Sequence, residues 1–217
     1  MLKRAFCLSI FAVGLVLFTG GLSDGGDKAK GKDKKDDPKY NNPTFVPTAD
    51  EVIEKMFEMG KVNKNDVIFD LGCGDNRICF MAAKKFGCRG VGIETNPVRI
   101  REAMDMFDKY NKDDAIVFGP VKLPMVETRH GDALAMKDLK DATVVVMYMF
   151  PEFMDLWFPI AEKTLKPGTR ILSHDYSWSD DKPWKPAATA TVKSSSRDNH
   201  KVLLWVVPEK KSTKTTK

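Results

Sequence analysis

The chain has 217 residues, of which 42% are hydrophobic and 30% are charged, and its formal net charge is +5. A chain of this length can bury one substantial core, and two full domains would be cramped. Its basic residues form no patch interleaved with aromatic side chains, so we expect no nucleic-acid partner. The four cysteines include no C-x-x-C pair and the three histidines are scattered, so we expect no metal site and no disulfide framework.

The N-terminal segment has the organisation of a targeting sequence. Lys3 and Arg4 precede an apolar run over residues 5–18, and small residues follow it. This pattern predicts a secretory signal peptide over residues 1–23. Counted over residues 5–22, the run is also just long enough for a single membrane anchor, so a membrane tether stays open.

Two further segments have the composition of unfolded chain. Residues 24–43 alternate lysine, aspartate and glycine with almost no apolar side chain, which predicts a disordered charged linker. Residues 209–217 follow the last apolar strand and are rich in lysine, which predicts a basic disordered tail. The folded domain is therefore predicted over residues 44–208.

The first helix of this domain is predicted from its boundaries and its periodicity. Thr48 and Glu51 have the spacing of a capping box at a helix N-terminus. Apolar residues over 52–57 then share one face, and Gly60 is a typical helix end.

The next stretch, residues 67–77, has the sequence V-I-F-D-L-G-C-G-D-N-R. Its apolar β-favouring start predicts a short buried strand that ends near Asp70. Gly72 and Gly74 have no Cβ, so the backbone there can turn tightly and approach a ligand closely. A helix follows from about Arg77. A strand, a glycine turn and a helix N-terminus together are typical of a nucleotide site at the carboxyl edge of a sheet.

A second strand, residues 90–94, places an acid beside this turn. Glu94 stands at the carboxyl end of that strand, where an acidic side chain can accept hydrogen bonds from both hydroxyls of a ribose. Asn96 and Pro97 then predict the cap and first residue of a helix. The turn differs from a dinucleotide fingerprint that starts at Gly72, because position 77 is arginine where that fingerprint needs glycine.

The remaining strands complete the predicted sheet. Residues 126–130 carry charges and predict an edge strand, whereas residues 142–149 form the most apolar strand and predict a central one. Residues 170–173 predict a further parallel strand, and residues 189–195 and 201–207 an antiparallel pair. The chain is therefore predicted to be an α/β protein with three layers. Its Rossmann-like, seven-stranded sheet is mostly parallel and ends in a C-terminal antiparallel hairpin.

The pattern D-x-G-x-G that begins at Asp70 resembles the first motif of class I S-adenosylmethionine-dependent methyltransferases. This resemblance implies S-adenosyl-L-methionine as the cofactor, with its methionine end along the glycine loop. Glu94 would hold the ribose hydroxyls and Asp132 the adenine amino group, while Cys73 is interpreted as a small packing residue of the loop. The residues that the resemblance assigns to cofactor binding are Asp70, Gly72, Cys73, Gly74, Glu94 and Asp132.

From residue 46 to about 208 the chain resembles a narrower group, the small Dot1-like and FAM173-like protein-lysine methyltransferases and their bacterial relatives. The matching stretches are V-P-T before the first helix, D-L-G-C-G-D with Arg77, M-Y-M-F-P, and L-K-P-G-T-R-I-L-S-H-D. Relatives usually carry glycine where this chain has Asn76. Asparagine is the non-glycine residue that best adopts positive φ, so we expect the turn to survive.

The resemblance implies in-line transfer of the methyl group from the sulfonium to the amine of a lysine in a protein substrate. That amine must first lose a proton, from a reference pKa of about 10.4. Tyr148 is the candidate for orienting the amine, and His174 for relaying or stabilising the proton. The alternative interpretation is that Tyr148 packs in the core and that His174 caps its strand.

Two other functions stay open. The acceptor could be a small molecule or a lipid, which a membrane tether would suit, or the domain could bind the cofactor without catalysis. The N-terminal segment predicts an exported or membrane-tethered protein, with Lys3 and Arg4 favouring export. The lysines of the linker, and a cofactor that is made in the cytoplasm, favour a folded domain that stays inside.

Overall fold

A seven-stranded sheet organises the part of the chain that the computed structural model describes, residues 45–111 and 125–209. Its strand order is β3-β2-β1-β4-β5-β7-β6, and β7 pairs antiparallel with both of its neighbours while the other pairs are parallel. The strands are β1 (Val67–Leu71), β2 (Arg89–Glu94), β3 (Val126–His130), β4 (Val144–Met147), β5 (Arg170–His174), β6 (Ala188–Val192) and β7 (His200–Val206). This arrangement confirms the predicted sheet, including β3 as an edge strand.

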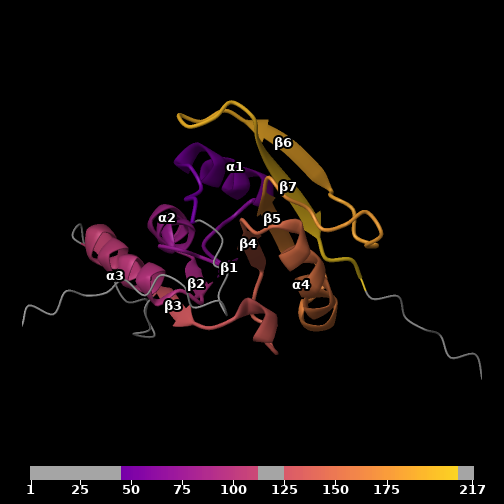
Figure 1. Ribbon diagram of the computed structural model, residues 1–217, viewed down its shortest axis with the longest axis horizontal. Helices are drawn as coiled ribbons and strands as arrows, with labels where there is room; N and C mark the ends of the chain where they lie inside the picture. The colour runs from indigo at the N-terminus through magenta and orange to yellow at the C-terminus, as the bar shows by residue number, and fades with distance from the viewer. Residues whose placement is uncertain (1–44, 112–124, 210–217) are drawn as a thin grey trace, which may run out of the picture. The chain divides into compact units, whose positions relative to one another are not determined.

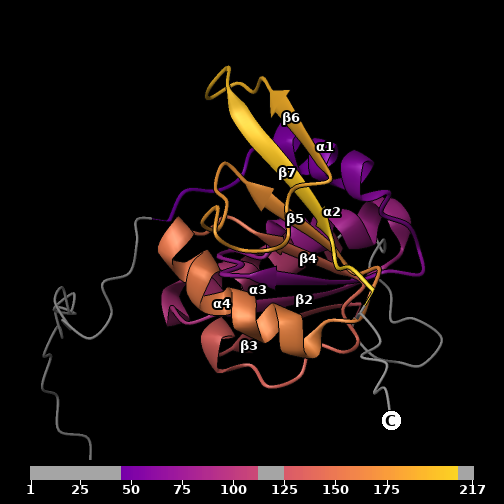
Figure 2. The same cartoon turned by 90° about the vertical axis from the view of Figure 1, so that its right-hand side faces the viewer.

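Helices cover both faces of the sheet and make the fold three-layered. The helices are α1 (Asp50–Gly60), α2 (Arg77–Phe86), α3 (Pro97–Asn111) and α4 (Pro151–Thr164). Apolar residues of α1 and α2 share one buried cluster, and those of α4 belong to a second. In Figure 1 the labels α1 and α2 lie together, and Figure 2 shows α4 in front of the sheet with α1 behind it.

The central strands are buried on both faces, as their continuous apolar runs predict. Successive side chains of a strand point to opposite faces. Val144 and Val146 accordingly pack into the cluster with α1 and α2, whereas Val145 and Met147 pack into the cluster with α4. All four residues of β4 are fully buried. Tyr148 follows directly, so the end of this rigid strand positions it.

The predicted capping box at the start of α1 is wrong. The N-cap residue is Ala49, which makes no side-chain capping bond, so Thr48 lies one position outside the helix. The Thr48 hydroxyl is buried and lies 3.2 Å from Nδ1 of His174 instead. A carboxylate oxygen of Glu51 accepts a hydrogen bond of 3.3 Å from the Ser195 N–H, at the turn between β6 and β7. Tertiary partners have replaced the local cap at both positions.

Asn76 confirms the expectation that the turn survives without a third glycine. It caps α2 in the left-handed region, with φ of 59°. Its side-chain nitrogen donates hydrogen bonds to the Thr128 hydroxyl at 2.8 Å and to the Glu127 carbonyl at 3.2 Å. Asn76 therefore ties the start of α2 to the edge strand β3 and is completely buried.

The predicted signal peptide or anchor (residues 1–23) and the linker (24–43) lie outside the described residues, as does most of the basic tail. Within residues 45–111 and 125–209, no helix is long and apolar enough to cross a membrane.

We expect Asn76→Ala to lower the free energy of unfolding by about 2–4 kcal/mol, because it strains a left-handed residue and removes two buried hydrogen bonds. Gly87→Ala is the matched control. Gly87 has φ of 68°, but a Cβ there would meet no atom within 4 Å, so only strain of about 1–2 kcal/mol is added. Urea unfolding of the two variants measures the difference. Equal losses of unfolding free energy in the two variants would show that the Asn76 side-chain hydrogen bonds to β3 contribute nothing to stability.

Candidate active site

A cavity of about 170 Å³ lies where β1, β2 and β4 end, at the edge of the sheet that the glycine turn occupies. Its lining includes Asp70 near the end of β1, Gly72 and Cys73 from the turn, and Glu94 from the end of β2. Part of the wall is aromatic, because Phe45, Tyr148, Phe150 and Tyr176 also line it.

Two hydrogen bonds fix the glycine loop to β2. The N–H groups of Gly72 and Cys73 donate to the Ile93 carbonyl at 2.9 and 3.0 Å. Gly72 and Gly74 have φ of 74° and 56°. A Cβ on Gly72 would lie 2.6 Å from Sδ of Met149 and one on Gly74 2.0 Å from the Phe45 ring, so both glycines permit close approach of their neighbours.

Glu94 faces the loop and is almost fully buried. One carboxylate oxygen, Oε2, accepts a hydrogen bond of 2.9 Å from the Gly74 N–H. The other, Oε1, accepts from the N–H groups of Thr95 and Asn96 at 2.9 and 2.8 Å. Each carboxylate oxygen can accept two hydrogen bonds, so Oε2 keeps capacity for a hydroxyl group in the cavity.

Asp70 carries a buried carboxyl group with one oxygen facing no donor in the described part of the chain. Its Oδ2 atom has no hydrogen-bond partner among the described residues. Burial raises the pKa of this carboxyl well above its usual 3.8, and the negative charges of Asp75 and Glu94 raise it further. A buried acceptor of this kind calls for a donor or a cation. Asp75 differs, because Arg77 pairs with both of its oxygens.

Tyr148 lies in the aromatic part of the wall, and its hydroxyl donates to Oδ2 of Asp175 at 3.3 Å. Its ring stacks on Tyr176 with centroids 5.9 Å apart, and Phe150 packs on Tyr176 at 5.3 Å. Burial, followed by the nearby Asp175 carboxylate, raises the pKa of the Tyr148 phenol. Tyr148 is therefore a neutral phenol at physiological pH.

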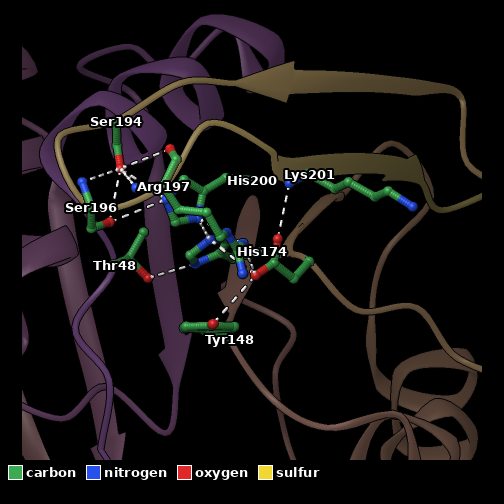
Figure 3. Close-up of polar contacts among 9 residues, drawn as sticks. Thr48, Tyr148, His174, Ser194, Ser196, Arg197, His200 and Lys201 are labelled. Carbon is green, nitrogen blue, oxygen red and sulfur yellow. Dashed lines mark hydrogen bonds and ion pairs between the residues drawn. The ribbon is translucent and has the colours of Figure 1, made fainter.

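His174 lies directly beneath Tyr148, with ring centroids 3.9 Å apart, but it does not line the cavity. It is 1% exposed, and its Nε2 atom lies 2.8 Å from Nδ1 of His200 (Figure 3). Burial is the main cause that lowers the pKa of His174 to about 4. His174 can therefore influence the cavity only through the neighbours that line it, Tyr148 and Thr48.

Asp132 lies apart from the other predicted cofactor residues. Its carboxylate accepts the Leu134 N–H at 2.8 Å and so caps the short 3-10 helix Ala133–Ala135. It does not line the cavity. Its role toward adenine stays a prediction. Cys73 does line the cavity, and burial raises the pKa of its thiol far above the usual 9.0, as suits a packing residue.

Several residues around Tyr148 and His174 were not predicted from the sequence. His200 on β7 and Arg197 in the preceding turn reach this place because β7 pairs antiparallel with β5. Thr48 was assigned to a helix cap. One signal for His200 and Arg197 was available in the sequence. An antiparallel pair was predicted after residue 188, and its polar turn could be expected near the end of β5.

Among the described residues, one group of side chains has the spacing of metal ligands: His174, Asp175 and His200, with ligand atoms within 4.8 Å of one another. The guanidinium of Arg197 already supplies a cation there. Its Nη2 atom lies 2.5 Å from Oδ2 of Asp175 and 2.9 Å from Nδ1 of His200. Hydrogen bonds account for the approach of these groups, and we assign no metal to them.

Comparison with known proteins identifies the family. The profile described as "ANTKMT methyltransferase domain" matches residues 70–187. The chain belongs to this methyltransferase family. It is 36% identical over 168 residues to a protein-lysine N-methyltransferase of Saccharolobus islandicus, which covers 77% of this chain and 95% of that protein.

Solved structures agree with this family. An RNA methyltransferase from Salinibacter ruber, in complex with S-adenosyl-L-homocysteine, is 34% identical with a TM-score of 0.64, covering 76% of this chain and 95% of that one. A precorrin-6y C5,15-methyltransferase from Geobacter metallireducens shares the fold at 16% identity and a TM-score of 0.58, over 80% and 96% of the two chains. The protein is therefore an S-adenosyl-L-methionine-dependent methyltransferase.

The cavity residues fit this cofactor. S-adenosyl-L-methionine carries an ammonium and a sulfonium on its methionine part and two hydroxyls on its ribose. The unpartnered Asp70 carboxylate would hold the cationic part, and the free capacity of Glu94 would hold the ribose. Gly72 leaves the loop backbone open to close approach. When bound, the cofactor supplies a methyl group that its sulfonium activates.

Glu94→Ala should weaken binding of S-adenosyl-L-homocysteine at least tenfold, because it removes the ribose acceptor and frees the Gly74 N–H. Glu127→Ala is the control. Glu127 lies on the edge strand β3, pairs with Arg129 and Arg89, and does not line the cavity. Calorimetry with both variants measures the affinities. A Glu94 variant that binds as tightly as the control would remove Glu94 from the site.

Cofactor binding should release a proton from Asp70. Its pKa is raised in the free protein, and a cation placed beside the carboxylate lowers it. Between the two pKa values binding therefore expels the proton, and affinity rises with pH. Calorimetry in two buffers of different ionisation enthalpy measures this release. It should vanish in Asp70→Asn, and equal heats for the wild-type protein in both buffers would contradict the assignment.

Proposed function

We propose that this enzyme methylates the side-chain amine of a lysine in a protein substrate. One support is the relative from Saccharolobus islandicus, which is named a protein-lysine N-methyltransferase and is 36% identical over most of this chain. The other is the aromatic part of the cavity, where Tyr148, Phe150 and Tyr176 stand together. Aromatic rings attract an ammonium group on an alkyl stem and also pack against the stem.

Tyr148 carries this proposal. Its hydroxyl donates its proton to Asp175, so the lone pairs of the phenol oxygen are available to accept a hydrogen bond from an amine. An amine held in this way has a defined direction toward the cavity. Methyl transfer is a displacement at carbon in which the protein mainly contributes alignment and exclusion of water. Phe150, which is 48% exposed, extends the aromatic wall toward the surface where a protein substrate would arrive.

A second acceptor class has one observation in its favour. The similar structure from Salinibacter ruber is named an RNA methyltransferase. The sequence, however, has no basic patch interleaved with aromatic residues, which is the usual mark of nucleic-acid recognition. Lysine is therefore the acceptor that we place first, ahead of RNA and of a small molecule or lipid.

We also propose, from the sequence alone, that the N-terminal segment exports the protein or tethers it to a membrane through residues 5–22. Mass spectrometry of the native protein would give its mature N-terminus. A cleaved N-terminus near residue 23 supports a signal peptide, and an intact one in a membrane fraction supports a tether. An intact protein in the soluble fraction would contradict both.

The acceptor class can be tested with tritiated cofactor and a cell extract separated into protein, RNA and lipid fractions. The proposal expects label in protein, with a mass shift of whole methyl groups on lysine in peptide sequencing. Label that nuclease treatment removes, or that extracts with lipid, would assign the other acceptors and contradict the proposal.

Tyr148→Phe should lower the rate of methyl transfer about 10–100-fold, because it removes the oxygen that orients the amine. Cofactor affinity should change less than threefold. Tyr110→Phe is the control, since Tyr110 lies on α3, stacks on Phe80 and does not itself line the cavity. Single-turnover rates of the two variants decide. Equal rates would leave Tyr148 a packing residue.

A further inference from the structure

Methyl transfer to lysine requires that the substrate ammonium lose a proton, and no residue has so far been assigned to accept it. This inference rests on the proposed lysine acceptor, whose ammonium has a reference pKa of about 10.4. The Tyr148 phenol cannot act as the base at neutral pH, because its raised pKa keeps it protonated. Thr48 also lines the cavity, and on its buried side it contacts a histidine.

A continuous row of hydrogen bonds runs from Thr48 to the protein surface (Figure 3). The Thr48 hydroxyl lies 3.2 Å from Nδ1 of His174, and Nε2 of His174 lies 2.8 Å from Nδ1 of His200. Nε2 of His200 lies 2.8 Å from the Ser194 hydroxyl. That hydroxyl is 2.9 Å from the hydroxyl of Ser196, which is exposed in the turn between β6 and β7.

Arg197 fixes the direction of these hydrogen bonds. Its Nη2 atom lies 2.9 Å from Nδ1 of His200, and a guanidinium can only donate. Nδ1 of His200 is therefore an acceptor, which places the proton of that ring on Nε2, facing Ser194. Nε2 of His174 must then donate to His200, and Nδ1 of His174 accepts from Thr48. From Thr48 as far as Ser194, each donor in the row therefore points away from the cavity and toward the surface.

The charges around His174 suit brief passage of a proton. Its ring is neutral at pH 7, because burial lowers its pKa to about 4, and so Nδ1 is free to accept. A proton that enters the ring meets the Asp175 carboxylate, whose Oδ2 atom is 3.5 Å from Nε2. His200 and Arg197 oppose a lasting positive charge there. Tyr148, whose ring lies tilted against the His174 ring, is a further titratable neighbour.

We propose that Thr48, His174, His200 and Ser194 form a proton-exit path for the methyl-transfer reaction. An N–H bond of the substrate ammonium breaks, and its proton binds the Thr48 oxygen as the Thr48 proton moves to Nδ1 of His174. The Nε2 proton of His174 passes to His200, and that of His200 passes to Ser194 and on to solvent. The amine keeps the electron pair for attack on the methyl carbon, solvent gains one proton, and nothing is oxidised or reduced.

In this path Thr48 is the group that touches the substrate, and the two histidines and Ser194 are positioning residues that act through it. Removal of the Thr48 hydroxyl should therefore lower the rate of methyl transfer most at a pH where the substrate lysine arrives protonated. At high pH, hydroxide in solution deprotonates the lysine before it binds, and the path is no longer needed. A merely structural role for Thr48 would give a loss that does not change with pH.

The test compares Thr48→Val, which keeps the shape without the hydroxyl, with Thr48→Ser, which keeps the hydroxyl. Single-turnover methylation of a lysine peptide by full-length protein is followed from pH 7 to pH 10. We expect Thr48→Val to be about 10–100-fold slower than the wild-type protein at pH 7 and within about threefold at pH 10. Thr48→Ser should retain most of the rate throughout. A Thr48→Val deficit that is absent, or constant with pH, overturns the path.

A second variant guards against misfolding at Thr48. His200→Ala interrupts the row next to the exposed turn, where a small base can enter. Its rate at pH 7 should fall at least tenfold, and millimolar imidazole should restore a good part of it. Loss without restoration, in a protein whose circular dichroism is unchanged, counts against the path.

The two proposals fail differently. If the wild-type protein labels lysine but the variants show no pH-dependent deficit, only the path is wrong. If the wild-type protein labels RNA or lipid and never lysine, the proposed function is wrong, and the path is overturned with it.

Discussion

The hydrogen bond from the Gly74 N–H to the Glu94 carboxylate is the interaction on which this site depends. It joins the turn after β1 to the end of β2, so that two segments separate in the sequence form one wall of the cavity. The bond needs a backbone N–H that points toward the Glu94 carboxylate, and Gly74 provides it in a left-handed conformation. It also needs a buried acid, and three N–H groups converge on the Glu94 carboxylate. The protein's own hydrogen bonds therefore fix this wall.

The C-terminal hairpin has a second function beside closing the sheet. Because β7 runs antiparallel to β5, its first residue, His200, lies beside the end of β5, and the turn before it carries Arg197. A further parallel strand would have placed its start at the opposite edge of the sheet. Reversal of this strand is what brings two histidines, a carboxylate and a guanidinium under Tyr148. The direction of β7 therefore determines which polar groups lie near Tyr148.

The sequence predicted those features that short stretches encode. The strand, turn and helix around Asp70, the acid at Glu94, and the positive φ of Asn76 all follow from neighbouring residues, and the structure has them. Prediction from the sequence failed where a residue that fits a local pattern makes a tertiary contact instead. Thr48 has the spacing of a helix cap, but its hydroxyl contacts His174, which is far along the chain. His200 and Arg197 could not be assigned, because their role depends on the pairing of β5 with β7.

The buried Asp70 carboxyl, with one oxygen that faces no donor among the described residues, has a consequence for the lifetime of the protein. Ionisation of this buried group opposes folding, and a bound cation reverses that penalty, so the loaded protein unfolds less often than the empty one. Proteases degrade a domain mainly while it is open. The half-life of the enzyme should therefore lengthen when the methyl donor is plentiful and shorten under methionine starvation, which links the abundance of the enzyme to its supply of donor.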